Sequence, residues 1–228
     1  MFLNIRLKNF LSFKDIDVSF GKAHPLDHAL FYGENGAGKT NFIQSISFLR
    51  ESTATLKAEA IIQKSKRSEY IERFPIPDLS EICRNARTNG STDNMLVHYE
   101  MIIDGGKTEY EMEFSGNTLV HEILKIRLKK KTGVLFEIKS TGTDIDKYLW
   151  TELITDPAFR TEVSGKIDRL WGKHSFLAIL NREYLENNRN FMDTRVHKVQ
   201  EVLDYIEKIL VSVKPVLSDF RQYNYSFL

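Results

Sequence analysis

Residues 33–40 of the chain read Gly33-Glu34-Asn35-Gly36-Ala37-Gly38-Lys39-Thr40. This stretch matches the phosphate-loop pattern G-x-x-x-x-G-K-[ST] at every fixed position. The apolar run at 28–32 predicts a short buried strand before the loop, and residues 41–49 predict a helix after it. In that setting the glycines let successive N–H groups form an anion-binding nest, and the helix N-terminus adds the positive end of its dipole. The stretch therefore predicts a nucleotide-phosphate site.

The loop predicts a role for each kind of side chain. Lys39 is the candidate catalytic residue, because its ammonium group can sit as a point charge on the β- and γ-phosphates. The Thr40 hydroxyl is the candidate metal ligand, for a Mg²⁺ ion that bridges the same phosphates. The complete candidate set for binding the nucleotide is Gly33, Glu34, Asn35, Gly36, Ala37, Gly38, Lys39, Thr40 and Asn41.

Hydrolysis of a nucleotide needs two further groups, an acidic Mg²⁺ partner at the end of a buried strand and a residue that orients the attacking water. The best match to the first is Asp104, after the apolar run 101–103. However, Asp104-Gly105-Gly106 is also a ready hairpin turn, which is the favoured interpretation. Asp204 follows an apolar residue too, but it lies inside a helical pattern. We therefore expect both acids to lie outside these 228 residues.

Composition limits the remaining possibilities. The 32 basic and 31 acidic residues nearly cancel, so net charge gives no indication of a nucleic-acid partner. Cys83 is the only cysteine, which excludes a disulfide framework and a cysteine zinc cluster and favours a reducing, cytoplasmic setting. The first residues alternate, unlike a signal peptide, and no apolar run approaches the roughly 20 residues of a membrane helix. We expect no membrane association.

The hydrophobic pattern divides the chain into two parts. Strands are predicted at 2–7 and 16–20, and an antiparallel meander with one solvent-exposed face at 95–138. Helices are predicted over 144–153, from Asp156-Pro157 onward, and over 196–213. The expected organisation is an ATP-binding lobe at 1–140 and a helical segment at 141–228. The expected fold class is α/β, with a mixed sheet around the phosphate-loop helix, the antiparallel meander and the C-terminal helical segment.

Two other groups of residues give weaker signals. The densest basic cluster is Lys125, Arg127, Lys129, Lys130 and Lys131. It is consistent with binding of DNA phosphates, but a charged sheet edge is the favoured interpretation. The six histidines show no paired metal-ligand spacing, so they are expected to be ordinary core or surface residues.

At this point the sequence resembles a known family. Residues 7–15, followed by residues 32–41, are similar to the start of ABC-class ATPases of the OLD, RecF and SMC type, which are AAA-family ATPases of phage defence, DNA repair and chromosome maintenance. In that family an Asn-Phe-x-Ser-Phe-like strand precedes a Gly-x-Asn-Gly-x-Gly-Lys-[Ser/Thr]-Asn loop. Within the meander Gly106, Tyr110, Phe114 and Glu122 resemble the OLD-like branch.

The resemblance implies the N-terminal lobe of a two-lobed P-loop NTPase head of the ABC type, with ATP and Mg²⁺ as cofactors. In the family a second lobe carries the signature motif and the Asp-Glu metal strand, and two heads enclose two ATP molecules. The resemblance therefore implies a homodimer or higher homo-oligomer, a nuclease or other effector as partner, and possible DNA binding. Since those later motifs are not found here, the chain is expected to be truncated before the second lobe.

Two alternatives stay open at this stage. One is a self-contained phosphate-loop kinase in which Asp104 is the metal ligand. The other is a nucleotide-binding module that never hydrolyses its nucleotide.

Overall fold

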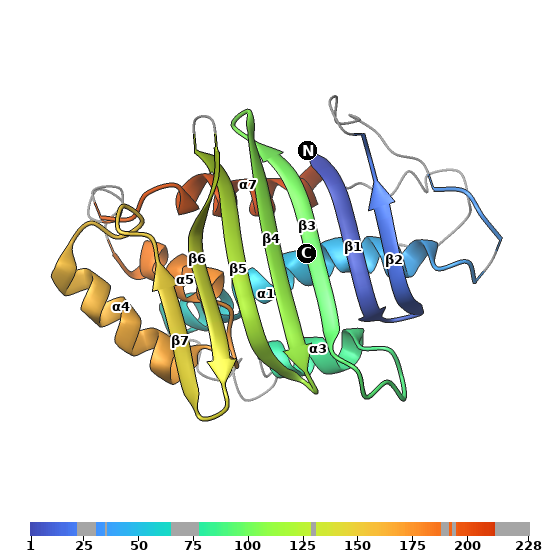
Figure 1. Cartoon of the computed structure of the whole chain (residues 1–228), viewed down its shortest axis with the longest axis horizontal. Coiled ribbons are helices and arrows are strands. Elements are labelled where there is room, and N and C mark those ends of the chain that lie inside the picture. Colours follow the sequence, from blue (N-terminus) through green and yellow to red (C-terminus); the bar gives the residue numbers. More distant parts are fainter. Residues whose placement is uncertain are drawn as a thin grey trace.

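The computed structural model describes residues 1–21, 31–34, 36–64, 78–128, 131–187, 192 and 195–212. Within these residues seven strands and five helices follow one another along the chain (Figure 1). The strands are β1 (Phe2–Phe10), β2 (Phe13–Ser19), β3 (Met95–Ile103), β4 (Gly106–Ser115), β5 (Thr118–Leu128), β6 (Lys131–Thr141) and β7 (Asp144–Leu149). The helices are α1 (Lys39–Lys64), α3 (Leu79–Ala86), α4 (Pro157–Leu170), α5 (Phe176–Glu186) and α7 (Val199–Ser212).

The strands form one sheet in the order β2-β1-β3-β4-β5-β6-β7. Each pair of neighbours in this order is antiparallel. The meander predicted over 95–138 is confirmed as β3 to β6. β1 connects the N-terminal hairpin to it, because Ile5 pairs with Val18 of β2 on one side and with Tyr99 of β3 on the other. The hairpin that precedes the phosphate loop is thus part of the same sheet as the meander.

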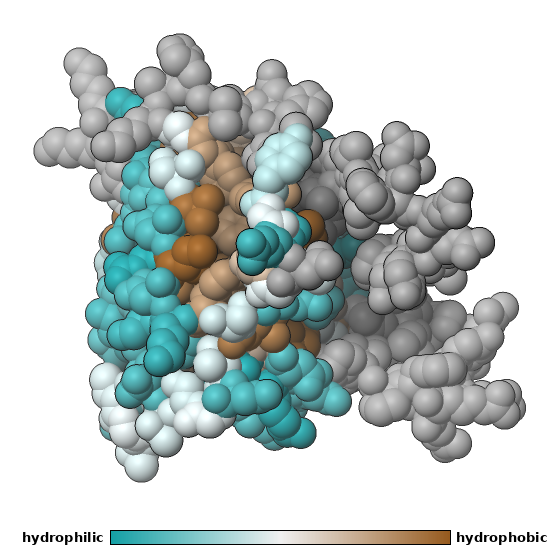
Figure 2. Space-filling model, turned by 90° about the vertical axis from the view of Figure 1, so that its right-hand side faces the viewer, coloured by the Kyte–Doolittle hydropathy of each residue, from teal (hydrophilic) through white to brown (hydrophobic). Residues whose placement is uncertain are grey.

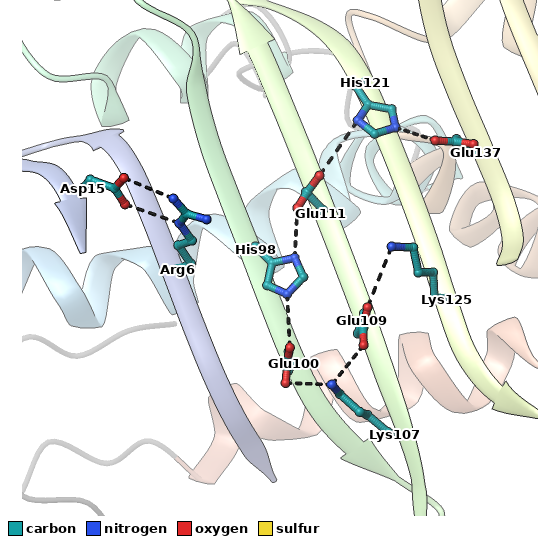
Figure 3. A network of polar contacts seen from close by, with 10 residues as sticks. All are labelled: Arg6, Asp15, His98, Glu100, Lys107, Glu109, Glu111, His121, Lys125 and Glu137. Atoms are coloured by element: carbon teal, nitrogen blue, oxygen red, sulfur yellow. Dashed lines mark hydrogen bonds and ion pairs between the residues drawn. The ribbon is translucent and has the colours of Figure 1, made fainter. Parts of the chain in front are cut away.

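The two faces of the sheet differ, as the alternation in the sequence predicted. Along β3 every second residue is buried, and the residues between them are half-buried. The buried set points to the helices, which lie behind the sheet in Figure 1. Tyr99, Tyr110 and Phe114 are fully buried there. The opposite face carries charged side chains (Figure 3), so the sheet is apolar only where helices cover it.

Helix α1 is the long element of the helical layer and crosses behind the sheet from β2 towards β6 (Figure 1). It continues through the stretch 54–62, so the first helix does not end after residue 49. Phe48, Leu49 and Leu56 anchor it in the core with at most 3% of their surface exposed. The α/β fold class is confirmed, with α1 packed on an antiparallel sheet.

The helix predicted over 144–153 is wrong. Residues 144–149 form the edge strand β7, which pairs with β6 after a turn at Gly142, where φ is 77°. Ile145 and Leu149 lie four residues apart, a spacing that suits one face of a helix and one face of a strand equally. The glycine turn and the free edge of β6 decide between the two.

The remaining helices largely follow the sequence. Asp156 caps α4 by accepting hydrogen bonds from the N–H groups of Ala158 and Phe159, and Pro157 begins the helix, as predicted. The apolar stripe at 196–213 is helical from Val199 onward, whereas Val196 forms a bridge with Ile154. The division of the chain at residue 140 stays a prediction. None of the described helices is long and apolar enough to cross a membrane.

The strand predicted at 28–32 is only partly described. Residues 28–30 lie outside the described residues, and Phe31 and Tyr32 are not part of a strand, so the prediction is wrong for these two. Tyr32 is 87% exposed, because its side chain points to solvent. Phe31 packs on Phe42 of α1, with ring centroids 5.0 Å apart. Every described strand pair is antiparallel, so the mixed sheet expected around α1 is not seen among the described strands.

Candidate phosphate-binding site

The phosphate loop leads directly into the N-terminus of α1. Gly36 and Gly38 have φ values of 89° and 85°, a backbone conformation that glycine adopts without steric cost. The first backbone hydrogen bond of the helix runs from Phe42 N to Gly38 O, at 2.9 Å. The N–H groups of the first helical turn have no acceptor inside a helix. Those of Lys39, Thr40 and Asn41 therefore lie where an anion can accept from them.

The Lys39 side chain folds back across the loop. Its Nζ atom donates to the carbonyl oxygens of Gly33 and Glu34, both at 2.7 Å. The ammonium group is thus held over the loop. The N–H group of Ala37 donates to the Glu34 carbonyl at 3.2 Å, so one donor of the predicted nest already has an acceptor within the loop.

The loop is open to solvent. Gly33, Glu34, Gly36, Ala37 and Thr40 are exposed, and a ligand can reach them from the surface. The three remaining described members of the predicted set, Gly38, Lys39 and Asn41, are half-buried. Asn35 lies outside the described residues. The structure therefore brings the described members together on one loop and one helical turn, while their binding roles stay predictions.

The turn between β1 and β2 packs against this loop, a contact that the sequence reasoning did not identify. A Cβ atom placed on Gly38 would lie 2.8 Å from two ring atoms of Phe13, so a larger residue there would require the Phe13 ring to shift. Asn41 Nδ2 donates to Ser12 Oγ at 2.7 Å. Ser12 and Phe13 belong to the Asn-Phe-x-Ser-Phe stretch that carries the family resemblance, which was the available signal.

Aromatic side chains fix α1 against the N-terminal hairpin. Phe42 packs on Phe20 as well as on Phe31, with ring centroids 6.1 Å apart in the first case. Phe10 and Phe48 meet edge to face at 5.6 Å. Tyr99 adds a buried hydrogen bond from its hydroxyl to the carbonyl of Ser45, at 2.6 Å. Seen from the side of β2, a hydrophobic area of the surface lies beside the hydrophilic outer face (Figure 2).

Asp104 does not complete the site. Asp104 and Gly105 both have positive φ, 47° and 73°, and they form the two-residue turn between the paired residues Ile103 and Gly106. β1 runs antiparallel to β3, so this turn lies at the opposite end of the strands from Phe10. Nine residues of β1 span about 30 Å. Among the described residues, no cluster of His, Cys, Asp and Glu side chains could hold a metal ion.

A buried polar centre, separate from the exposed phosphate loop, lies on the helix side of the sheet. Glu122 is fully buried and accepts hydrogen bonds from Tyr110 OH and Trp171 Nε1, each at 2.8 Å, and from the N–H of Phe176 at 2.7 Å. A longer bond comes from the N–H of Leu177, at 3.4 Å. Burial raises the pKa of Glu122, and these hydrogen bonds oppose the rise. The carboxylate thus fixes the N-terminus of α5 to the sheet.

Charged side chains on the outer face of the sheet form a third polar group (Figure 3). His98 and Glu111 contact each other at 3.0 Å, and so do His121 and Glu137. Burial alone would lower the pKa of His98, but its hydrogen bond to Glu111 and the nearby carboxylates raise it. The same hydrogen bond lowers the pKa of Glu111. These side chains neutralise one another on the face of the sheet that α1 does not cover.

The described members of the basic cluster do not lie on an edge strand, which corrects the favoured interpretation for Lys125, Arg127 and Lys131. β5 lies between β4 and β6, and Lys125 forms an ion pair with Glu109 at 3.8 Å. Arg127 is exposed near the end of the strand. Lys129 and Lys130 lie outside the described residues.

Comparison with known proteins gives one positive result. A family model described as an AAA domain matches residues 4–210, which is most of the chain and includes the phosphate loop and all of the sheet except the first two residues of β1. A search of curated proteins found no match.

Proposed function

This chain belongs to the AAA domain family, the P-loop ATPases of the SMC and RecF-like group, and on that premise we propose that residues 33–41 bind ATP with Mg²⁺. We further propose that the chain is the ATP-binding part of an ATPase of DNA maintenance or phage defence. ATP would drive the association of two heads, and that association would control a nuclease or another effector.

The observation that carries the first proposal is the junction between loop and helix. Two glycines with positive φ lead into a helix whose first N–H groups point to the open loop. The Lys39 ammonium lies over the same loop, within 2.7 Å of two of its carbonyl oxygens. A triphosphate offers better acceptors than carbonyl groups, because its oxygen atoms are negatively charged and add Coulomb attraction to the hydrogen bond from the ammonium group. Lys39 would therefore transfer from the carbonyl groups to the phosphates.

The donor set also fits a Mg²⁺ ion that is held mainly by the nucleotide. Thr40 follows Lys39 directly and offers one hydroxyl oxygen in the first exposed turn of α1. Mg²⁺ is usually bound by one or two protein oxygens together with substrate phosphates and water. When bound, the ion would neutralise phosphate charge. The described residues contain no group of three or more His, Cys, Asp and Glu side chains that could hold a metal ion, and we propose that the acidic Mg²⁺ partner comes from outside them.

The test of nucleotide binding is a calorimetric titration of the full chain with ATP, with and without Mg²⁺. We expect wild-type binding to be stronger with Mg²⁺, and Lys39→Ala to weaken it about 100-fold, which corresponds to about 2.7 kcal/mol. Thr40→Ala should remove the Mg²⁺ effect. Lys8→Ala is the matched control, because Lys8 is an exposed lysine on β1. Equal affinities of wild type and Lys39→Ala would refute the proposal.

A second experiment tests whether ATP hydrolysis requires residues from outside the described part of the chain. We expect the isolated chain to hydrolyse ATP slowly, because hydrolysis needs an acidic Mg²⁺ partner and the best candidate in the sequence, Asp104, lies in the β3–β4 turn. Rapid turnover that Lys39→Ala abolishes would show that the chain is self-sufficient. Light scattering with and without ATP would report on association of the heads, and an unchanged mass would count against the proposed dimerisation.

A further inference from the structure

We propose that Ser12 is a positioning residue for nucleotide binding: through Asn41 it holds the first turn of α1 in the geometry that receives the phosphates. Phe13 supports it by packing on Gly38. The inference rests on the proposed binding of ATP and adds residues from a different part of the chain. Ser12 acts through Asn41, so it is not itself a phosphate ligand.

The β1–β2 turn, residues 9–13, has an unusual backbone. Asn9 and Leu11 both have positive φ, 51° and 48°. For residues other than glycine this left-handed conformation costs roughly 1–2 kcal/mol each, although asparagine tolerates it better than leucine does. Strain of this kind persists only where the surrounding structure imposes it, and it is often found beside functional sites.

The surroundings impose it here through α3 and the residues that follow it. Leu11 N donates to the carbonyl of Ala86 at 2.7 Å, and Thr88 N donates to the carbonyl of Asn9 at 3.0 Å. Asn9 Nδ2 also donates to the carbonyl of Asn94 at 2.8 Å. Each strained residue is thus held by a hydrogen bond from outside the turn. The turn is a fixed support and not a freely moving hairpin end.

The fixed turn contacts the site at two positions that bracket its two key side chains. Phe13 meets Gly38, immediately before Lys39. Ser12 Oγ accepts from Asn41 Nδ2 at 2.7 Å, immediately after Thr40. Lys39 and Thr40 therefore lie between two anchored residues. Since a displacement of about 1 Å in a binding group can cost much of its effect, anchoring both ends preorganises the donors.

A purely structural hairpin contact would give a different pattern of effects. Ser12 is exposed and Asn41 is half-buried, so their hydrogen bond contributes little to folding. A structural role predicts a small loss of stability and no loss of affinity. A positioning role predicts a loss of ATP affinity with little loss of stability. The loss of affinity should be larger when Mg²⁺ is present, because Thr40 adjoins Asn41.

The experiment measures ATP affinity and thermal unfolding of wild type, Ser12→Ala, Asn41→Ala and the double variant. We expect each single variant to bind ATP with Mg²⁺ about 5–20-fold more weakly, and the double variant to be no weaker than the worse single one, because both break the same contact. Without Mg²⁺ the loss should shrink. Unfolding temperatures should stay within about 2 °C of wild type. Ser12→Thr keeps the hydroxyl and should restore affinity, and Ser19→Ala is the matched control.

The outcomes separate the two proposals. If wild type binds ATP and Lys39→Ala does not, while Ser12→Ala binds like wild type, the positioning role is wrong and the binding site stands. Additive losses in the double variant, or a Ser12→Thr variant as weak as Ser12→Ala, would also overturn the positioning role. If wild type does not bind ATP, both proposals are wrong, and the wild-type titration identifies that case.

Discussion

The N-terminal turn of α1 and the section of this helix that faces α5, around residues 52–53, are held in different ways. At its N-terminus the helix meets solvent, and a few contacts with the β1–β2 turn hold it. Further along, Ser52 and Thr53 are buried, and their carbonyl groups accept hydrogen bonds from Ser175 and Asn181 of the α5 region. Ser175 is also the N-cap of α5, whose first N–H groups bind Glu122. The N-terminal turn, here called the open end, can receive a ligand, whereas the section that faces α5, here called the locked end, is fixed in the core.

This difference assigns separate tasks to the two ends. Buried polar groups are costly unless they are satisfied, so the α5 end should determine stability. The loop end exposes its donors, so substitutions there should change binding more than folding. The predictions below test that separation.

The largest effect is expected at the locked end. Glu122→Ala would leave up to four buried donors without their acceptor, and each unsatisfied group costs about 1–3 kcal/mol. We expect the free energy of unfolding to fall by roughly 4 kcal/mol, measured by denaturant titration. ATP affinity of the molecules that remain folded should be unchanged.

Glu122→Gln is the matched control. It keeps the size and one acceptor oxygen but places an NH₂ group against donors, so it should lose less stability than Glu122→Ala does. A loss below about 1 kcal/mol in Glu122→Ala would mean that the α5 end is not locked by this carboxylate.

A smaller effect on stability, with a large effect on binding, is expected for Gly38→Ala. The new Cβ would meet Phe13 at 2.8 Å and would need a positive φ. We expect a loss of about 2 kcal/mol in stability and about 100-fold weaker ATP binding, which corresponds to about 2.7 kcal/mol. Calorimetry on the folded variant measures the second effect.

Gly36→Ala provides the comparison within the same loop. Gly36 also has positive φ, but nothing lies within 4 Å of a Cβ placed there. It should therefore suffer only the backbone strain, about 1 kcal/mol. Equal losses in the two variants would show that contact with Phe13 does not constrain the loop. Recovery of Gly38→Ala by Phe13→Leu would show that it does.

The local sequence pattern was sufficient to predict much of this fold. The phosphate loop, the meander and the cap at Asp156 depend on residues that are close in sequence, and each was predicted. The helix at 144–153 failed because its apolar spacing fitted two periods, and only the position of β6 in space decides between them.

The contacts between distant segments could not be predicted in the same way. Glu122 meets Trp171 and Phe176 only after the chain has folded, and in the sequence it looks like one more charged residue in a meander. Ser12 and Asn41 lie 29 residues apart and were both visible in the motif, but neither residue alone indicates a hydrogen bond between them.

A moderate effect at the locked end is expected for Asn181→Ala. Asn181 Nδ2 donates to the carbonyl of Thr53 at 3.0 Å, and a single hydrogen bond contributes about 1 kcal/mol. Asn41→Ala is the same change at the open end. We expect denaturant titration to show the loss in Asn181→Ala only, and calorimetry to show weaker ATP binding in Asn41→Ala only. The reverse result would break the separation of tasks.

The smallest effect is expected on the outer face, which neither end of α1 contacts. Because Glu111 raises the pKa of His98 in the folded chain, the folded state binds that proton more tightly than the unfolded state does. The stabilisation is complete below the unfolded pKa of about 6.5 and is lost as the pH rises through the higher folded pKa. For a half-buried pair this stabilisation should stay below about 1 kcal/mol.

Denaturant titrations of wild type and His98→Gln near pH 6 and near pH 8 should show a stability difference that shrinks at the higher pH. The pH dependence of ATP affinity should be the same in wild type and in His98→Gln. A change of wild-type affinity with pH that His98→Gln abolishes would show that the outer face is coupled to the loop and would contradict the comparison.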